Sequence, residues 1–300
     1  MKNTTKAHLA VLGTNLFFAA NFSFVKLISP EFIKPFALNG LRVGISVLLF
    51  WAIWLAGKTP AGIQRKDYGR FALCALTGVA INQMLFIKGL TMTSTVHASL
   101  LMLTTPLLIA VFAFLVLKEA VTKSKIAGLV LGIGGALLLI LSKENTAHAA
   151  DYLLGDMLIL VNAISYSVYF ILVKPLMERY SPLQVIRWVF TMGLFMVLPF
   201  AWSELGDLQF RVFGPREFAA LAAVIITGTF LAYIFNAYGI QHLGAGITGT
   251  YIYTQPVFAV LIATFLLGEE LSAAKMIAAL MIFTGVYLVS FKKTKARSPE

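Results

Sequence analysis

The stretch TTPLLIAVFAFLVLKE at residues 104–119 returns 150 residues later as TQPVFAVLIATFLLGE at residues 254–269. Both copies place a proline third in a long apolar run and a glutamate at its end. Further residues pair at the same offset without a gap: Thr77, Gly78, Gly89, Leu117, Lys125, Gly135 and Leu138 with Thr227, Gly228, Gly239, Leu267, Lys275, Gly285 and Leu288. Apolar chains match easily by chance, so the ordered Gly, Pro, Glu and Lys pairs carry the argument. They predict an internal repeat.

The composition of the chain is that of a membrane protein. Hydrophobic residues make up 59% of its 300 residues, charged residues only 12%, and the mean hydropathy is +0.85. A soluble domain of this length needs a polar surface, which so few charged residues cannot supply. Lipid accommodates an apolar exterior, so we expect a protein that crosses the membrane many times.

Apolar runs of about 20 residues, the length that spans a bilayer as a helix, occur ten times. The first is long for a cleaved signal peptide, so we expect it to remain as a helix. The ten predicted spans are residues 7–29, 33–56, 68–90, 94–117, 123–142, 154–175, 182–203, 217–240, 245–267 and 273–291.

The predicted fold class is therefore an all-α integral membrane protein of ten transmembrane helices in two inverted five-helix repeats. The first repeat is expected at residues 1–145 and the second at residues 150–295. Each repeat has an odd number of spans, so the second enters the membrane in the opposite orientation. Such a pair is typical of secondary transporters, whose substrate site lies between the halves.

The distribution of Lys and Arg predicts the orientation of the chain. With both termini on one side, 15 Lys and Arg fall near that side and five near the other. Cytoplasmic segments carry the excess of basic residues. We expect a multi-pass protein of the cytoplasmic (inner) membrane with both termini cytoplasmic.

Residues 100–139 and 250–289 share a further pattern: a helix with a central proline and a terminal glutamate, then a helix with glycine near its end. This pattern resembles the two EamA repeats of the drug/metabolite transporter superfamily. The resemblance covers nearly the whole chain and implies ten helices, inverted halves and a central cavity. It also implies export of amino acids or other metabolites, as in many members. Ala278 stands where the first half has Gly128.

Polar side chains within predicted spans are costly in lipid, so they are candidates for a solute site. The alternative for each is a hydrogen bond between helices. Several recur on one helical face, and the family's central site is lined by helices of the same rank. The predicted substrate-binding residues are Asn21, Asn82, Gln83, Phe86, His97, Ser165, Tyr169, Tyr233, Asn236, Tyr251 and Gln255.

Three basic residues within predicted spans are candidate contacts for a carboxylate or phosphate: Arg42, Lys88 and Arg187. The alternative is that they bind backbone carbonyls or reach the headgroups. His97 belongs to the residue type that titrates near neutral pH, so it is also a candidate proton site. No Asp or Glu lies deep in a predicted span, so the sequence offers no carboxylate relay.

Pro106 and Pro256 stand in the middle of their predicted spans and are expected to kink them as paired hinges. The single cysteine, Cys74, lies in an apolar run and is expected to pack there. It excludes an intrachain disulfide and a cysteine metal cluster.

These features predict a secondary transporter that moves a small metabolite by alternating access, with an amino acid or similar amphipathic solute favoured. The expected mode is export or exchange. A sugar-nucleotide or phosphate-ester antiporter is the alternative, with the basic residues as anion clamps. An intramembrane enzyme is disfavoured because no HExxH or Asp-rich pair is present and His occurs only four times. The net charge of +11 is assigned to lipid anchoring rather than nucleic acid.

We expect no cofactor and no bound metal. The expected partners are a small-molecule substrate and membrane lipid, and the chain is expected to be a monomer.

Overall fold

The computed structural model describes residues 3–57, 62–117, 123–141, 149–268 and 272–290. In these residues the chain forms helices and no strand. The first half contains α1 (Asn3–Ile28), α2 (Pro35–Ala56), η1 (Arg65–Asp67), α3 (Tyr68–Ala75), η2 (Leu76–Ala80), α4 (Ile81–Met92), α5 (Thr95–Met102), α6 (Thr104–Leu117) and α7 (Lys123–Leu141). The second half contains α8 (Ala149–Arg179), α9 (Pro182–Gly206), η3 (Phe210–Val212), α10 (Pro215–Ile225), η4 (Ile226–Leu231), α11 (Ala232–Thr250), η5 (Tyr251–Thr254), α12 (Gln255–Leu267) and α13 (Ala273–Ser290).

Six helical segments in the described residues are long and apolar enough to cross a membrane, and four shorter apolar helices accompany them. Each half contributes three of the long segments, and the third of each half is a composite, of α3, η2 and α4 or of α10, η4 and α11. The all-α prediction with ten helices in two halves is confirmed. Glu119 and Glu269, which the repeat pairs, lie outside the described residues.

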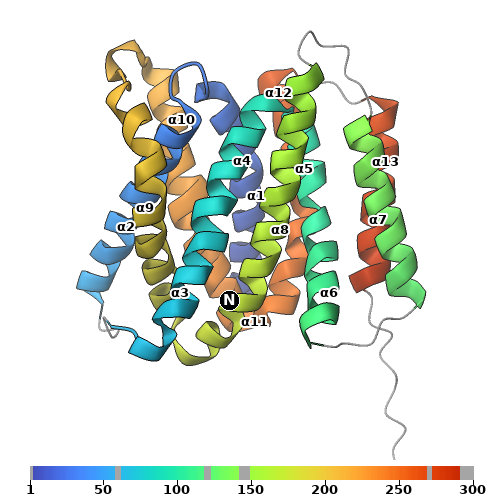
Figure 1. The fold of residues 1–300 in the computed structure, drawn as a ribbon, viewed down its shortest axis with the longest axis horizontal. Coiled ribbons are helices and arrows are strands. Elements are labelled where there is room, and N and C mark those ends of the chain that lie inside the picture. Colours follow the sequence, from blue (N-terminus) through green and yellow to red (C-terminus); the bar gives the residue numbers. More distant parts are fainter. Residues whose placement is uncertain (1–2, 58–61, 118–122, 142–148, 269–271, 291–300) are drawn as a thin grey trace, which may run out of the picture.

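The helices run roughly parallel in one bundle, with α2 and α9 at one edge and α7 and α13 at the other (Figure 1). The most extensive contacts join the two halves: α7 packs on α13, α4 on α8, α2 on α9 and α1 on α11. In two of these pairs, α7–α13 and α2–α9, a helix packs on its equivalent in the other repeat. The other two pairs, α4–α8 and α1–α11, are equivalent to each other under the repeat. The halves are therefore interleaved around a pseudo-two-fold axis.

Local sequence explains where several helices begin and end. Proline, whose fixed φ suits the first turn, stands at the start of α2, α9 and α10. Ser94 and Ser181 accept hydrogen bonds from the backbone N–H of His97 and Gln184, which caps α5 and α9. Gly268 ends α12 with a φ of 68°, a left-handed conformation that glycine adopts at no steric cost.

The fourth and ninth spans are broken rather than kinked. The α5 helix ends at Met102 and α6 begins at Thr104, so Pro106 lies in the first turn of α6. In the second half the four-residue turn η5 precedes α12, and Pro256 lies in the first turn of α12. The expected mid-helix kinks therefore need a correction: each proline starts the second part of a discontinuous span, where its missing N–H needs no partner.

One predicted boundary is absent from the structure. The sequence predicts a separation of the eighth and ninth spans near residues 241–244, yet α11 continues from Ala232 to Thr250. No proline falls within this helix, and single glycines are tolerated in helices at a modest cost. The composition of residues 241–250 therefore does not end the helix.

The contact between α7 and α13 depends on glycine. A Cβ atom added at Gly285 would lie 2.5 Å from the carbonyl oxygen of Gly128 and 2.6 Å from the nitrogen of Gly132. Backbone atoms cannot move aside as the end of a side chain can. The two helices thus approach each other as closely as glycine permits.

We predict that Gly285→Val destabilises the protein by about 1–3 kcal/mol, because the added side chain forces α13 away from α7. Thermal unfolding of the detergent-solubilised full chain measures this change. Gly69→Val is the matched control, since a Cβ at Gly69 meets nothing within 4 Å. Equal melting temperatures for the two variants would contradict the tight α7–α13 contact.

Candidate functional site

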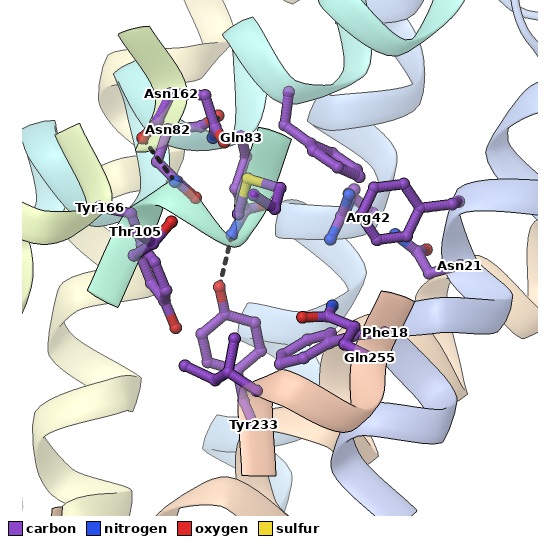
Figure 2. Close-up of a pocket in the computed structure, with 14 residues that line it drawn as sticks. Phe18, Asn21, Arg42, Asn82, Gln83, Thr105, Asn162, Tyr166, Tyr233 and Gln255 are labelled. Atoms are coloured by element: carbon purple, nitrogen blue, oxygen red, sulfur yellow. Dashed lines mark hydrogen bonds between the residues drawn. The ribbon is translucent and has the colours of Figure 1, made fainter. Parts of the chain in front are cut away.

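A cavity lies between the two halves of the bundle, and 14 residues line it (Figure 2). They come from the first, second, third and fourth spans of the first half and from the sixth, eighth and ninth spans of the second. The lining residues are Phe18, Asn21, Phe22, Arg42, Asn82, Gln83, Phe86, Met102, Thr105, Asn162, Tyr166, Tyr233, Ile252 and Gln255. The cavity is thus mixed, with aromatic rings, neutral polar groups and one cation.

Arg42 is the charged group of this cavity. It projects from α2 and is 4% exposed, and its Nε donates a hydrogen bond to Oγ1 of Thr229, at 3.0 Å. Its Nη1 has no hydrogen-bond partner among the described residues. No Asp or Glu lines the cavity in the described part of the chain. A buried guanidinium without a counter-charge favours a bound anion.

Four further polar atoms of lining residues have no hydrogen-bond partner among the residues described: Oδ1 of Asn21, Oε1 of Gln83, Oγ1 of Thr105 and Oδ1 of Asn162. Gln83 itself is held by its amide, whose Nε2 donates to Oη of Tyr233 at 3.4 Å. Figure 2 shows Gln83 and Tyr233 from opposite halves meeting across the cavity, with Arg42 and Asn21 to one side. The site therefore combines one cationic donor with several neutral acceptors.

Asn82 and Asn162 join the halves at the wall of the cavity. Nδ2 of Asn162 donates to the carbonyl oxygen of Asn82 at 2.6 Å, and Nδ2 of Asn82 donates to the carbonyl oxygen of Asn162 at 3.4 Å. Both side chains are buried. This reciprocal pair fixes α4 against α8 and with them the positions of Gln83 and Tyr166.

Aromatic rings pack against one another around these polar groups. Phe22 meets Phe86 edge to face with ring centroids 5.0 Å apart, and Phe18 meets Tyr233 in the same way at 5.8 Å. Tyr233 also packs edge to face on Phe190 at 4.8 Å. Such pairs give a firm apolar lining that suits the hydrocarbon part of an amphipathic solute.

Two π-helical turns stand beside the cavity at equivalent places in the repeats. One is η2, which a single residue separates from Asn82 and Gln83, and the other is η4, which a single residue separates from Tyr233. A π-turn adds a residue to the helix and so rotates the residues after it, and it is often found at functional sites. Each contains a glycine on which a side chain of the other half rests: Tyr169 on Gly78 and Asn21 on Gly228.

A second cavity adjoins the first at the end of the bundle where α1 begins. It is lined by Tyr166, Tyr169, Phe170, Val173, Lys174, Met177, Ile186, Tyr233, Asn236 and Ala237. Tyr166 and Tyr233 line both cavities, so these two rings lie between them. The predicted site residues Tyr169 and Asn236 belong to this second cavity.

Of the predicted substrate-binding residues, the central cavity brings together Asn21, Asn82, Gln83, Phe86, Tyr233 and Gln255. Three others form contacts outside the central cavity. Ser165 donates to the carbonyl oxygen of Thr77 at 2.7 Å, and Oη of Tyr251 lies 2.8 Å from Nδ1 of His8. His97 contacts Asp156. The structure therefore places these three residues outside the lining of the central cavity.

Of the three expected anion contacts, Arg42 lines the cavity and Lys88 and Arg187 do not. Arg187 is fully buried between helices, and its guanidinium carbon lies 4.7 Å from the ring centre of Trp51 and 5.2 Å from that of Trp54. These cation–π contacts place its charge away from the cavity. Lys88 is half-buried on α4 and does not line the cavity either.

Asp156 is a buried carboxylate that the sequence pattern does not single out, since it lies near the start of its predicted span. It is 2% exposed on α8, and its Oδ2 lies 3.1 Å from Nδ1 of His97. Oγ1 of Thr93 donates to its Oδ1 at 2.5 Å. The predicted span begins only two residues before Asp156, whereas α8 begins at Ala149, so its apparent place near a helix end conceals its burial.

Sequence reasoning also omits lining residues from the predicted site: Phe18, Phe22, Met102, Thr105, Asn162, Tyr166 and Ile252. Asn162 carries a usable signal, since it shares a helical face with Ser165 and Tyr169. The apolar members carry none, because a Phe or Met within a span is equally typical of a lipid-facing or core position.

A helical membrane protein with a polar cavity between interleaved halves has the organisation of a secondary transporter. The chain matches the EamA-like transporter family over residues 5–141 and 153–291. It belongs to that family, and is accordingly a multi-pass membrane transporter.

Individual relatives agree with this assignment. An uncharacterized transporter of Archaeoglobus fulgidus is 25% identical over 292 residues, covering 96% of this chain and 99% of its own. A probable terminal-alkyne amino-acid exporter of Streptantibioticus cattleyicolor is 26% identical over 247 residues, covering 80% of each chain. A crystal structure, 18% identical, superposes with a TM-score of 0.64 over 95% of this chain and 97% of its own. That likeness concerns the fold.

We predict that the two hydrogen bonds between Asn82 and Asn162 contribute separately to the packing of α4 on α8. Asn82→Leu or Asn162→Leu each removes one buried amide donor from the backbone carbonyl oxygen of the other residue, at a cost of about 1–3 kcal/mol, while the remaining side chain keeps its own carbonyl acceptor. The double variant removes both bonds and is expected to cost about the sum of the two. Unfolding of the detergent-solubilised protein measures all three, and single variants as stable as the wild type would contradict the contact.

Proposed function

We propose that this transporter carries a small zwitterionic solute, an amino acid before others, through the central cavity, as an exporter or exchanger. The observation that carries the proposal is the buried Arg42, which lines the cavity, whose Nη1 has no hydrogen-bond partner among the described residues, and beside which no described lining residue is acidic. Membership of the family supports transport, and the site supports the class of solute.

A carboxylate matches the charge and the hydrogen-bond donors of the Arg42 guanidinium. The planar guanidinium presents paired N–H donors that match the two oxygens of a carboxylate. Its Nε is already held by Thr229, which fixes the orientation of the group before a solute arrives. Removing both charges from water is costly, and the cost is offset only when the hydrogen bonds are complete. The carboxylate of a solute supplies the counter-charge that the protein lacks there.

The remaining features of the cavity suit the other end of an amino acid. The ammonium group of the solute needs acceptors, which Oδ1 of Asn21 and Oε1 of Gln83 provide. The faces of Phe18 and Tyr233 offer an attractive surface to a cation and to an apolar side chain. Among the relatives, one is named a probable terminal-alkyne amino-acid exporter, and its name supports the same class of solute.

The phosphate-ester alternative receives less support from the site. A phosphate group with two negative charges favours several cations, as in sites built from Arg and Lys clusters. Lys88 and Arg187, the residues expected to complete such a clamp, lie outside the cavity. One guanidinium alone suits a single carboxylate better. The relatives named as transporters likewise favour transport over catalysis.

Alternating access is supported by the interleaved, inverted halves. Exchange of the conformations of two similar halves converts an opening on one side into an opening on the other. Tyr166 and Tyr233 separate the central cavity from the second cavity, so movement of these rings would join the two. The excess of Lys and Arg supports cytoplasmic termini, which makes the second cavity the cytoplasmic entrance.

We predict that Arg42→Gln weakens uptake of the transported amino acid into proteoliposomes by about tenfold to a hundredfold in KM, the worth of a charge-assisted hydrogen bond. Arg70→Gln, at an exposed position of α3, is the matched control and should leave KM unchanged. Initial rates with labelled amino acids give both values. Unchanged KM in Arg42→Gln would remove Arg42 from the site.

Competition by unlabelled analogues separates the two solute classes. An amino acid is expected to inhibit transport of the labelled solute, and its amide, which lacks the carboxylate, should inhibit far less because Arg42 then finds no counter-charge. Phosphate esters should not compete. Inhibition by a sugar nucleotide or phosphate ester, with none by amino acids, would establish the alternative.

A further inference from the structure

A buried acid–histidine pair lies away from the solute cavity, at the end of the bundle where α1 finishes. His97 of α5 and Asp156 of α8 are each 2% exposed in their side chains and stand 3.1 Å apart. They come from different halves of the chain. Thr93, in the turn between α4 and α5, donates to Asp156, and Nζ of Lys26 donates to the carbonyl oxygen of Thr93 at 2.5 Å.

Other ionisable groups surround the pair on the helices packed against it. The ring of Tyr152 of α8 stands edge to face with His97, with centroids 6.3 Å apart. The helices α6 and α12 carry no ionisable side chain in their described bounds. The described charged and histidine side chains on the remaining neighbours of α5 and at the start of α8 are Lys6, His8, Lys26, Lys88, Asp151 and Lys275, of which Lys6 and His8 lie at the opposite end of α1. Asp156 contacts the imidazole directly.

The helices that meet at this pair also build the solute cavity. The α4 helix carries Asn82 and Gln83, α8 carries Asn162, and Met102 at the end of α5 lines the cavity. A change in the position of α5 at the pair is therefore transmitted directly to the cavity wall.

The helices α4 and α8 pack more closely on each other than α5 packs on either of them. The α4 and α8 backbones touch at Gly89 and Gly155, where a Cβ on either would lie 2.9 Å from the carbonyl oxygen of the other. By contrast, α5 is an eight-residue helix separated from α6 by a break at Leu103. The His97–Asp156 contact therefore joins a short helix, set off from α6 by a break, to a closely packed pair.

We propose that His97 and Asp156 form the proton-binding site of this transporter, and that one proton bound there is exchanged for one solute. The proposal rests on the proposed function. The proton comes from solution on one side, forms an N–H or O–H bond within the pair, and leaves to solution on the other side. No other bond forms or breaks.

The physical basis is the cost of charge away from water. Binding of a proton changes the charge of the pair by one unit where solvent is nearly excluded, so the two states favour different packing of α5 on α8. Since Met102 of α5 also lines the cavity, the protonated and unprotonated forms of the pair bind the solute with different affinities. That difference in affinity is the link between the two fluxes.

The test uses the full chain in proteoliposomes that contain a pH-sensitive dye and a labelled amino-acid mixture. In the wild type, solute leaving the vesicles is expected to carry protons in the opposite direction, and an imposed pH gradient should drive accumulation. Asp156→Asn and His97→Gln should abolish both effects, yet retain exchange of labelled for unlabelled solute at equal pH. Asp156→Glu, which keeps the carboxylate, should keep proton flux.

Ser167→Ala is the matched control, because it removes another buried hydrogen bond of α8, to the carbonyl oxygen of Thr105, without an ionisable group. It should leave proton flux intact. Thr93→Val adds a milder variant that removes only the hydroxyl donor to Asp156. The carboxylate then loses a hydrogen bond, so the pH profile of exchange should change. An unmoved pH profile counts against the proposal even where the other variants fail to fold.

The outcomes separate this proposal from the proposed function. Amino-acid exchange without proton flux in the wild type overturns the proton site and leaves the solute class standing. Proton flux that persists in Asp156→Asn and His97→Gln shows the pair to be structural. If no amino acid moves at all, the solute class fails. The proton site is then decided by acid–base titration of purified protein, in which the double variant should take up fewer protons than wild type and equal uptake would refute it.

Discussion

Hydrocarbon offers no hydrogen bond, so each polar group inside this bundle must find its partner within the protein or in the solute that the protein carries. Asn82 and Asn162 satisfy each other across the halves, and Ser165 uses the carbonyl oxygen of Thr77. Arg42 satisfies only part of its guanidinium, through Thr229. In the cavity this pairing is left incomplete, and its unpaired groups, such as Nη1 of Arg42, are ones that a solute can bind.

The repeat gives the polar interior its arrangement. Equivalent π-turns, η2 and η4, each receive a side chain of the opposite half on a glycine, Tyr169 on Gly78 and Asn21 on Gly228. Yet Asn21 lines the central cavity and Tyr169 the second one. The equivalent contacts at η2 and η4 therefore lie beside different cavities, because the side chains in the two repeats differ. Symmetric backbones with unequal side chains suit a protein whose two ends must behave differently.

The fold could be predicted from the sequence because hydropathy and the offset of 150 residues are properties of whole segments. The residues of the site were harder to predict, since they depend on which face of each helix points into the bundle. Polar residues such as Gln83 and Gln255 stand out in an apolar run, whereas Phe22 and Met102 do not. The π-turns rotate the helical residues after them, which no 3.6-residue pattern anticipates. Asp156 was missed because the predicted span boundary lies too close to it, and the role of Arg187 because its aromatic partners are distant in sequence.

We propose that the solute binds in the cavity lined by Arg42 and Gln255 and that this cavity opens to both sides in turn. Cys74 is the single cysteine of the chain, so Gln255→Cys in a Cys74→Ser background gives one reporter thiol. Its reaction with a membrane-impermeant thiol reagent, added to either side of oriented proteoliposomes, measures access. We predict reaction from both sides, slowed by the transported amino acid. Reaction from one side only, or at a rate that a transported solute leaves unchanged, would contradict this account.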